Sequence, residues 1–233
     1  MTATDLILAL DTTGRTGSAA LATAQDVLET RVWRAEPSHT PHLHRATTGL
    51  LCSAGPRIAA IAVAAGPGGF SAVRGGMAIA KGICLGLDIA LVATPSLEAV
   101  ALSADFPLEG RVLALIDAGA RGCFAGEFAI DGTGPTPVTE PILAVPDTIA
   151  RAIAAGAHPV GDLPAARLEQ IAAAFPAGSA APPITAPDSL AAAVATLGWS
   201  KLEHSTGRDA LGTVPTYLRE PDATLPKKGW GRT

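Results

Sequence analysis

A glycine-rich loop joins an apolar strand to a helix in the first third of the chain. Residues 58–65 form an apolar run of strand length, and the sequence Gly-Pro-Gly-Gly at 66–69 follows it directly. From residue 71 the apolar residues recur with helical spacing as far as residue 86. Glycines at such a junction let the backbone approach a ligand closely, and the unpaired N–H groups of the helix start attract anions. The junction predicts an α/β fold with a candidate anion site where the strand ends.

The turn Asp-Thr-Thr-Gly at 11–14, between strands expected at 6–10 and 18–22, is a second candidate phosphate element. Such a turn offers backbone N–H groups to phosphate oxygens, and its carboxylate can order a hydrated magnesium ion. An ordinary Asx turn has the same composition, so both interpretations stay open. The glycine loop lacks the Gly-Lys-Ser/Thr of a P-loop, and Ser71 occupies the third glycine position of GxGxxG. The candidate phosphate or nucleotide residues of the two elements are Asp11, Thr12, Gly66, Gly68 and Gly69.

The helix that follows the loop contains four glycines. Each one costs about 1 kcal/mol relative to alanine in a helix interior, so other interactions must offset roughly 4 kcal/mol. Close approach by another element would do so, because residues at i, i+3/i+4 and i+7 share one side of a helix. That element is either the chain's own sheet or a partner helix. The residues on this side are Ala72, Gly75, Gly76, Ile79, Gly82, Ile83 and Gly86.

Strands and helices alternate along the chain in two similar halves. The strand, turn and strand at 6–22 recur at 112–130, where Asp117 again ends the first strand. A polar break containing proline and glycine, near 105–110, separates the halves. The expected organisation is a first domain at 1–104 with helices at 40–54 and 71–86, and a second domain at 105–233 with a flexible loop at 176–187 and a mobile tail at 221–233.

Composition excludes several classes of protein. Lys and Arg number 17 against 21 Asp and Glu, and the net charge of −4 argues against broad binding of nucleic acid by this chain alone. No apolar run approaches the roughly 18 residues of a membrane span, and the N-terminus lacks the basic start of a secretory signal. Three cysteines at wide spacings fit reduced thiols better than a disulfide framework. We therefore expect a cytoplasmic protein with no membrane contact.

Three histidines near the start of the 40–54 helix raise the question of a metal site, but their spacing does not suit one. His39, His42 and His44 stand at i, i+3 and i+5, whereas helical metal pairs stand at i and i+4. The sequence has no GxSxG, and the cysteines lie among apolar or small residues, where a thiol usually belongs to the core. We expect no metal site and no catalytic residues in this chain.

A set of motifs runs in order over nearly the whole chain. The segments are Leu8 to Thr13 with Gly17 to Leu21, His39-Thr40, Gly66 to Arg74, Leu115 to Ala118 and Pro215 to Arg219. Together they resemble the bacterial TsaB (YeaZ) family, which is also filed under the glycoprotease name. The glycine loop and the Tyr-Leu-Arg sequence near the C-terminus are the most specific parts of the resemblance.

The resemblance implies an α/β fold of two actin/Hsp70-like (ASKHA) subdomains, each a mixed sheet with flanking helices. It implies a role in making threonylcarbamoyladenosine on tRNAs that read codons starting with A. In the family this type of subunit is a non-catalytic scaffold for a TsaD-like catalytic subunit, and a TsaE-like ATPase joins the assembly. Contact with tRNA comes only through the complex, and family members alone form homodimers.

Pairing in the family uses the first two helices, which match 40–54 and 71–86 in this chain. The resemblance therefore favours a partner helix as the element that covers the glycine-rich side. The interface residues that it implies are Leu43, Thr47, Leu50, Ala72, Gly75, Gly76, Ile79, Gly82, Ile83 and Gly86.

Two residues of the loop region depart from the family pattern. Gly69 replaces a common serine, and Ala72 replaces a common glycine. The missing hydroxyl and the added methyl disfavour tight nucleotide binding, while Arg74 can meet a phosphate or an acidic partner residue. ATP or ADP with magnesium is therefore considered only at a subunit junction. The alternative function is an ATP-using phosphotransferase of the ASKHA type, based on Asp11, the glycine loop and Asp117; metalloprotease action rests on the family's other name alone.

Overall fold

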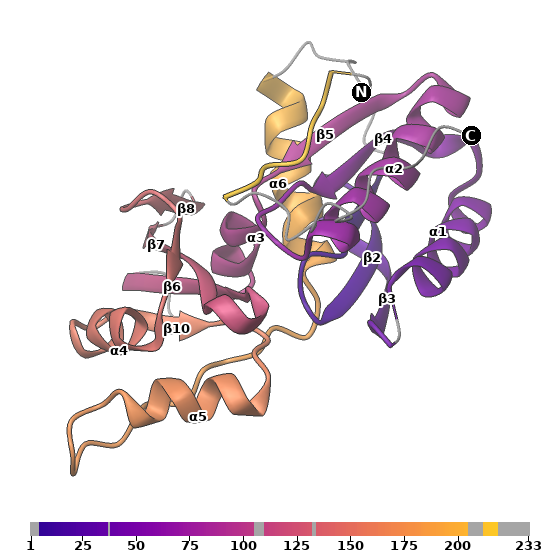
Figure 1. Cartoon of the computed structure of the whole chain (residues 1–233). Coiled ribbons are helices and arrows are strands. Elements are labelled where there is room, and N and C mark those ends of the chain that lie inside the picture. Colours follow the sequence, from indigo (N-terminus) through magenta and orange to yellow (C-terminus); the bar gives the residue numbers. More distant parts are fainter. Residues whose placement is uncertain (1–4, 37, 105–109, 132–133, 205–211, 219–233) are drawn as a thin grey trace, which may run out of the picture.

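The structure is a computed structural model of the 233-residue chain and describes residues 5–36, 38–104, 110–131, 134–204 and 212–218. It contains two mixed β-sheets, each flanked by helices (Figure 1). The α-helices are α1 (Thr40–Ala54), α2 (Phe70–Leu87), α3 (Ser96–Leu102), α4 (Pro146–Ala154), α5 (Ala165–Ala173) and α6 (Ala191–His204), and the short 3-10 turns are η1 (Gly55–Arg57) and η2 (Gly119–Arg121).

The first sheet is built around a strand that is buried on both faces. Strand β1 pairs antiparallel with β2 and parallel with β4, and its residues from Leu6 to Leu10 expose no surface. Uninterrupted apolar runs of this kind are typical of strands that helices cover on both sides. The strands, in the order β3-β2-β1-β4-β5, are β1 (Leu6–Asp11), β2 (Thr16–Ala22), β3 (Val27–Arg34), β4 (Ile58–Ala64) and β5 (Ala90–Thr94).

Helices from distant parts of the chain cover the two faces of the first sheet. Helices α1 and α2 pack on one face, where Leu43 and Met77 share a core with Leu8. Helix α6 covers the opposite face, where Val194 packs with Ile7. The last described helix therefore returns to the first sheet, although the sequence places it in the second half of the chain.

The second sheet carries helices on both faces as well. Helix α3 lies between the two sheets and contributes Leu97 and Val100 to the core against Phe124 (Figure 1). Helices α4 and α5 pack on the other face through Ile149 and Ile171. The order is β10-β6-β7-β8, with β9 also paired to β7, and the strands are β6 (Gly110–Asp117), β7 (Cys123–Asp131), β8 (Gly134–Pro137), β9 (Ile142–Ala144) and β10 (His158–Val160).

Most predicted elements are present, with differences at the less periodic segments. Strands β8 and β9 were not predicted, and helix α6 ends at residue 204. In the loop expected at 176–187, Thr185 forms an isolated bridge with Val160, which fastens that end of the loop to the second sheet. The division near residue 105 stays a prediction, and residues 105–109 and the tail at 221–233 lie outside the described residues.

Helix α6 approaches the first sheet closely at Gly198, and this contact yields a test. A Cβ at residue 198 would lie 2.6 Å from Ala62 Cβ and 2.9 Å from Ile7 Cδ1. We predict that Gly198→Ala lowers the free energy of unfolding by about 1–3 kcal/mol in urea titrations, because the core has no room for the methyl group. Gly82→Ala is the matched control: it has open space around it and should raise stability by about 1 kcal/mol. Equal effects at the two positions would contradict the packing described here.

Candidate functional site

The glycine loop uses its own N–H groups within the chain. Gly66 N–H donates to Ser96 Oγ at 2.9 Å, and Gly69 N–H donates to the Thr13 carbonyl at 3.2 Å. Pro67 has no N–H group to offer. Three of the four loop residues therefore have no N–H group free for a phosphate.

Two other segments press against this loop. A Cβ on Gly68 would lie 2.7 Å from the Thr13 carbonyl oxygen, and one on Gly66 would collide with the carbonyl of Thr216. The Thr216 N–H donates to the Ala65 carbonyl at 2.7 Å, which fastens the segment 212–218 to the end of β4. The glycines thus admit the chain's own backbone at the place where the sequence predicted a ligand.

Asp11 is held inside a local turn. Its Oδ1 accepts hydrogen bonds from the N–H (3.0 Å) and the hydroxyl (2.6 Å) of Thr13, which is the Asx turn that the sequence left open. The carboxyl group is fully buried, and its Oδ2 has no partner among the described residues. Burial raises the pKa of Asp11 to about 6, although the bonds from Thr13 act in the opposite direction.

Thr12 fastens the same turn to α2. Its hydroxyl donates to the Ala72 carbonyl at 2.8 Å, and a Cβ on Gly76 would lie 2.5 Å from that hydroxyl oxygen. Thr12 is 1% exposed, so it offers no surface to a ligand. Gly76 is required for contact within the chain, and the expectation that it lines a partner interface is wrong.

A cavity of about 20 Å³, enough for about one water molecule, lies between the two halves beside Asp162. Asp162 bridges the halves by accepting hydrogen bonds from Thr16 Oγ1 (2.6 Å) and Arg34 Nη1 (2.9 Å). Asp117, the counterpart of Asp11, accepts a hydrogen bond from Arg167 Nε at 3.4 Å. The same guanidinium donates to the Gly119 carbonyl.

The residues present therefore do not fit ATP or ADP with magnesium within this chain. Oδ1 of Asp11 and Oδ1 of Asp117 accept hydrogen bonds from groups of the chain itself, and the cavity of about 20 Å³ beside Asp162 is too small for a nucleotide. Asp11 and Thr12 of the expected phosphate set are buried, the N–H groups of Gly66 and Gly69 bond within the chain, and Gly68 packs against Thr13. Arg74 is exposed and bonds the chain through Nε.

Arg74, the cation of that set, faces an aromatic cluster. Its Nε donates to the Tyr217 hydroxyl at 2.8 Å, and its Cζ lies 3.8 Å above the centre of the Phe70 ring. Sequence reasoning assigned no role to Phe70 or Tyr217. Their place in the two most specific parts of the family resemblance is the signal that could have identified them.

The exposed side of α2 differs from the set expected for a partner interface. Leu43, Thr47 and Leu50 of α1 are at most 3% exposed and belong to the chain's own core, so the expectation that they line an interface is wrong. Gly82 and Gly86 have nothing within 4 Å of a Cβ. Sequence reasoning missed Leu85 and Leu87, which are 58% and 53% exposed beside these glycines.

Helix α2 is long and apolar enough to cross a membrane by length and composition alone, which corrects the expectation that no apolar run approaches that length, and 28% of its residues are buried in the chain. Core helices of soluble proteins have the same composition, but they are mostly buried. Packing within this chain therefore does not account for the apolar composition of α2. Between its start and that of α1 lies a groove of about 400 Å³, lined by residues that include Thr40, Ser71 and Gly75. An apolar, glycine-containing side of α2 is thus open to solvent beside a groove.

The histidines are not arranged as metal ligands. His39 accepts a hydrogen bond from Trp33 Nε1 at Nδ1 (3.1 Å), and its Nε2 lies 3.0 Å from the Gly14 carbonyl as donor. Burial lowers the pKa of His39, which favours the neutral imidazole. The hydrogen bonds at its two ring nitrogens fix the orientation of the ring. Within the described ranges no group of three His, Cys, Asp or Glu side chains is placed to hold a metal ion.

Two of the cysteines are buried thiols. Burial raises the pKa of Cys84 to about 11 and that of Cys123 to about 12, which makes both poor nucleophiles. Cys52 is exposed on α1.

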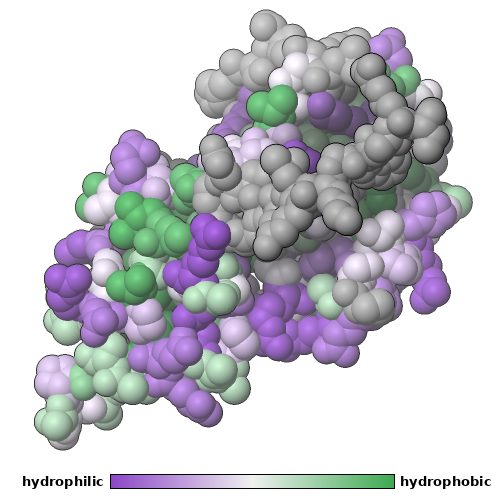
Figure 2. Space-filling view, in the orientation of Figure 1, coloured by the Kyte–Doolittle hydropathy of each residue, from purple (hydrophilic) through white to green (hydrophobic). Residues whose placement is uncertain are grey.

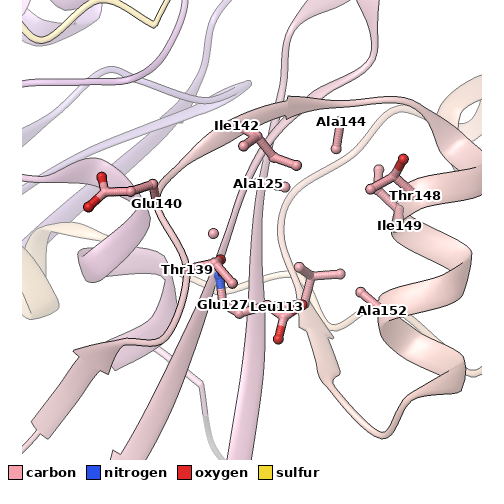
Figure 3. Close-up of a pocket in the computed structure, with 11 residues that line it drawn as sticks. Leu113, Ala125, Glu127, Thr139, Glu140, Ile142, Ala144, Thr148, Ile149 and Ala152 are labelled. Carbon is pink, nitrogen blue, oxygen red and sulfur yellow. The ribbon is translucent and has the colours of Figure 1, made fainter.

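A separate pocket of about 380 Å³ lies on the second sheet, on the face that α4 covers (Figure 3). Ile149 and Ala152 of α4 line it from one side, and Leu113 and Ala125 line it from the strands. The pocket contains no residue that the sequence singled out. Figure 2 shows hydrophobic residues gathered on this half of the molecule, and the exposed ones near the pocket are Val138, Ile142, Leu143 and Val145.

The two mixed sheets, each with an Asp-containing turn after its first strand, define an α/β protein of the actin/Hsp70-like (ASKHA) class. A family model described as "TsaD: tRNA N6-adenosine threonylcarbamoyltransferase" matches residues 34–158, which is more than half of the chain. The chain belongs to this family. Among curated proteins, none matches it.

Two solved structures from Pseudomonas aeruginosa have the same fold. One, described as an uncharacterized protein with similarity to peptidase YEAZ, is 24% identical, with a TM-score of 0.73 over 92% of this chain and 100% of that one. The other, described as YeaZ, is 20% identical, with a TM-score of 0.68 over the same shares of the two chains. These likenesses confirm the predicted resemblance at the level of the fold.

The buried carboxyl group of Asp11 predicts a particular dependence of stability on pH. Its pKa is about 6 in the folded chain against an ordinary value of 3.8, so the folded chain binds this proton more tightly than the unfolded chain. Ionisation of Asp11 therefore removes stability as the pH rises from about 4 to above 6. We predict that the stability of Asp11→Asn relative to that of the natural chain increases across this range, by on the order of 3 kcal/mol. Urea unfolding at a series of pH values measures it, and a difference that does not change with pH would contradict the burial of this group.

Proposed function

We propose that this chain is a non-catalytic scaffold subunit for transfer of a threonylcarbamoyl group to tRNA adenosine, and that it supports a TsaD-like catalytic subunit. The observation that carries this proposal is the exposed side of α2. Gly82 and Gly86 weaken the helix without making room for anything in the chain itself, and Leu85 is exposed next to them. A helix docked on this side would make use of the missing side chains and cover the apolar ones.

The proposed docking face consists of the exposed and half-exposed residues of α2. The members retained from the sequence are Ala72, Gly75, Ile79, Gly82, Ile83 and Gly86, and the structure adds Ala78, Leu85 and Leu87. Helix α1 would contribute its exposed residues, such as His44 and Thr48, in place of its buried leucines. The same face would form a homodimer when the chain is alone, so the two kinds of pairing would compete.

The arrangement of the polar groups supports a non-catalytic role. Asp11 and Asp117 accept hydrogen bonds from Thr13 and Arg167, and the cavity of about 20 Å³ beside Asp162 is too small for a nucleotide. The net charge of −4 argues against broad binding of tRNA by this chain alone, so RNA would be met through the assembled complex, together with a TsaE-like ATPase. Such a complex would act in the cytoplasm.

A substitution on the docking face tests the pairing. We predict that Gly82→Leu weakens binding to a TsaD-like subunit at least about 100-fold in calorimetric titration, because the leucine side chain would hold the two helices apart. Ala166→Leu, at an exposed position of α5, is the matched control and should bind as the natural chain does. Circular dichroism checks that both variants are folded, and unimpaired binding by folded Gly82→Leu would count against this face.

Reconstitution tests the function itself. A TsaD-like subunit, a TsaE-like ATPase and an enzyme that forms threonylcarbamoyl-adenylate are mixed with tRNA, with or without this chain. We predict that modified adenosine forms only with the chain present, and that Gly82→Leu abolishes it while Ala166→Leu does not. Equal product without the chain would refute the scaffold role.

A further inference from the structure

Arg74, Phe70 and Tyr217 form a compact cluster at the start of α2. Phe70 and Arg74 are four residues apart and so lie on the same side of the helix. Tyr217 comes from the other end of the chain, and its ring centre lies 5.1 Å from that of Phe70 at an interplanar angle of 36°. The guanidinium carbon of Arg74 is 3.8 Å from the centre of one ring and 5.7 Å from the other.

This cluster holds the guanidinium in one orientation. The Phe70 ring supports one side of it, and the hydrogen bond from Nε to the Tyr217 hydroxyl, 2.8 Å long, fixes its rotation. The segment that carries Tyr217 is itself fastened, since the Thr216 N–H donates to Ala65 and Leu218 packs on the core of the second sheet. An arginine held in this way loses little side-chain freedom when its two terminal nitrogens bind an acceptor.

The terminal nitrogens of Arg74 have no acceptor among the described residues, and the side chain is exposed. Arg34 and Arg167, in contrast, reach carboxylates of the chain itself. Arg74 also continues the proposed docking face, because Arg74, Ala78 and Gly82 follow one another at intervals of four residues and all three are exposed. The oriented cation therefore stands at the N-terminal end of that face.

We propose that Arg74 is an anchor for a carboxylate of the partner subunit, an inference that rests on the proposed function. A guanidinium with two free terminal nitrogens forms paired hydrogen bonds with a carboxylate or with a phosphate. The N–H groups of Gly66 and Gly69, which could add donors for a phosphate, already bond Ser96 and Thr13, and the exposed apolar residues of α2 favour a protein partner. Tyrosine and arginine beside an apolar helix face are also the residues that most often dominate the affinity of a protein interface.

The test is the dissociation constant of the complex between this chain and the TsaD-like subunit. Arg74→Ala should weaken binding about 10- to 100-fold. Arg74→Lys should weaken it nearly as much, because an ammonium group cannot form these paired hydrogen bonds. Tyr217→Phe keeps the ring and removes only the hydroxyl, and we expect a smaller loss of about 3- to 10-fold. Arg151→Ala, which removes an exposed arginine of α4, is the matched control for charge and should change nothing.

Charge reversal identifies the partner group. Arg74→Glu should abolish binding, and one Asp or Glu changed to Arg in the TsaD-like subunit should restore it. Equal affinity of Arg74→Ala and the natural chain, while Gly82→Leu fails to bind, would overturn this inference and leave the proposed function standing. No binding by the natural chain would overturn both.

Two further measurements distinguish the other groups that could bind the terminal nitrogens of Arg74. When ATP is titrated into the free chain, we expect no binding heat that depends on Arg74. If ATP binds and Arg74→Ala abolishes that binding, the ligand of Arg74 is a phosphate and not a carboxylate. The chain's own Glu220 and Asp222 follow the described segment. Arg74→Ala should still weaken binding to the TsaD-like subunit in a chain that carries Glu220→Gln and Asp222→Asn. If it no longer does, the carboxylate that Arg74 binds belongs to the chain's own tail.

Discussion

The contact between the first turn of the chain and the start of α2 determines how that helix is rotated. The Thr12 hydroxyl occupies the space that a side chain at residue 76 would take, and it also bonds the Ala72 carbonyl. With this side of α2 turned inward, Met77 and Cys84 face the first sheet and the opposite side faces solvent. A helix presents its residues in a fixed angular order, so this one orientation places the exposed glycines, the exposed leucines and the Arg74 guanidinium on the side that faces solvent.

The sequence predicted the fold well because its signals were periodic. Long apolar strands and helices with a repeat near 3.6 residues are recognisable from the sequence pattern. Strand β8 contains two prolines in four residues, and its pattern does not predict a strand. Helix α6 runs through Gly198, where its close packing on Ala62 leaves no room for a side chain.

The candidate site could be predicted only in part. Gly76 and Gly82 are the same residue type in the same helix, and only the packed structure distinguishes the one that contacts Thr12 from the one that contacts nothing. The apolar row at Leu43, Thr47 and Leu50 was assigned to an interface although such a row normally faces the core, as it does here. The cluster of Phe70 and Tyr217 depends on a pairing across 147 residues of chain, which no local pattern encodes.

The return of α6 to the first sheet affects the order in which this chain can fold during synthesis. One face of β1, with Ile7 and Ala9, receives its cover from residues near 191–202. Until the ribosome has released that helix, strand β1 has only one face covered by helices. The first half of the chain therefore cannot complete its core as an independent nascent domain, and its assembly has to wait until α6 has emerged.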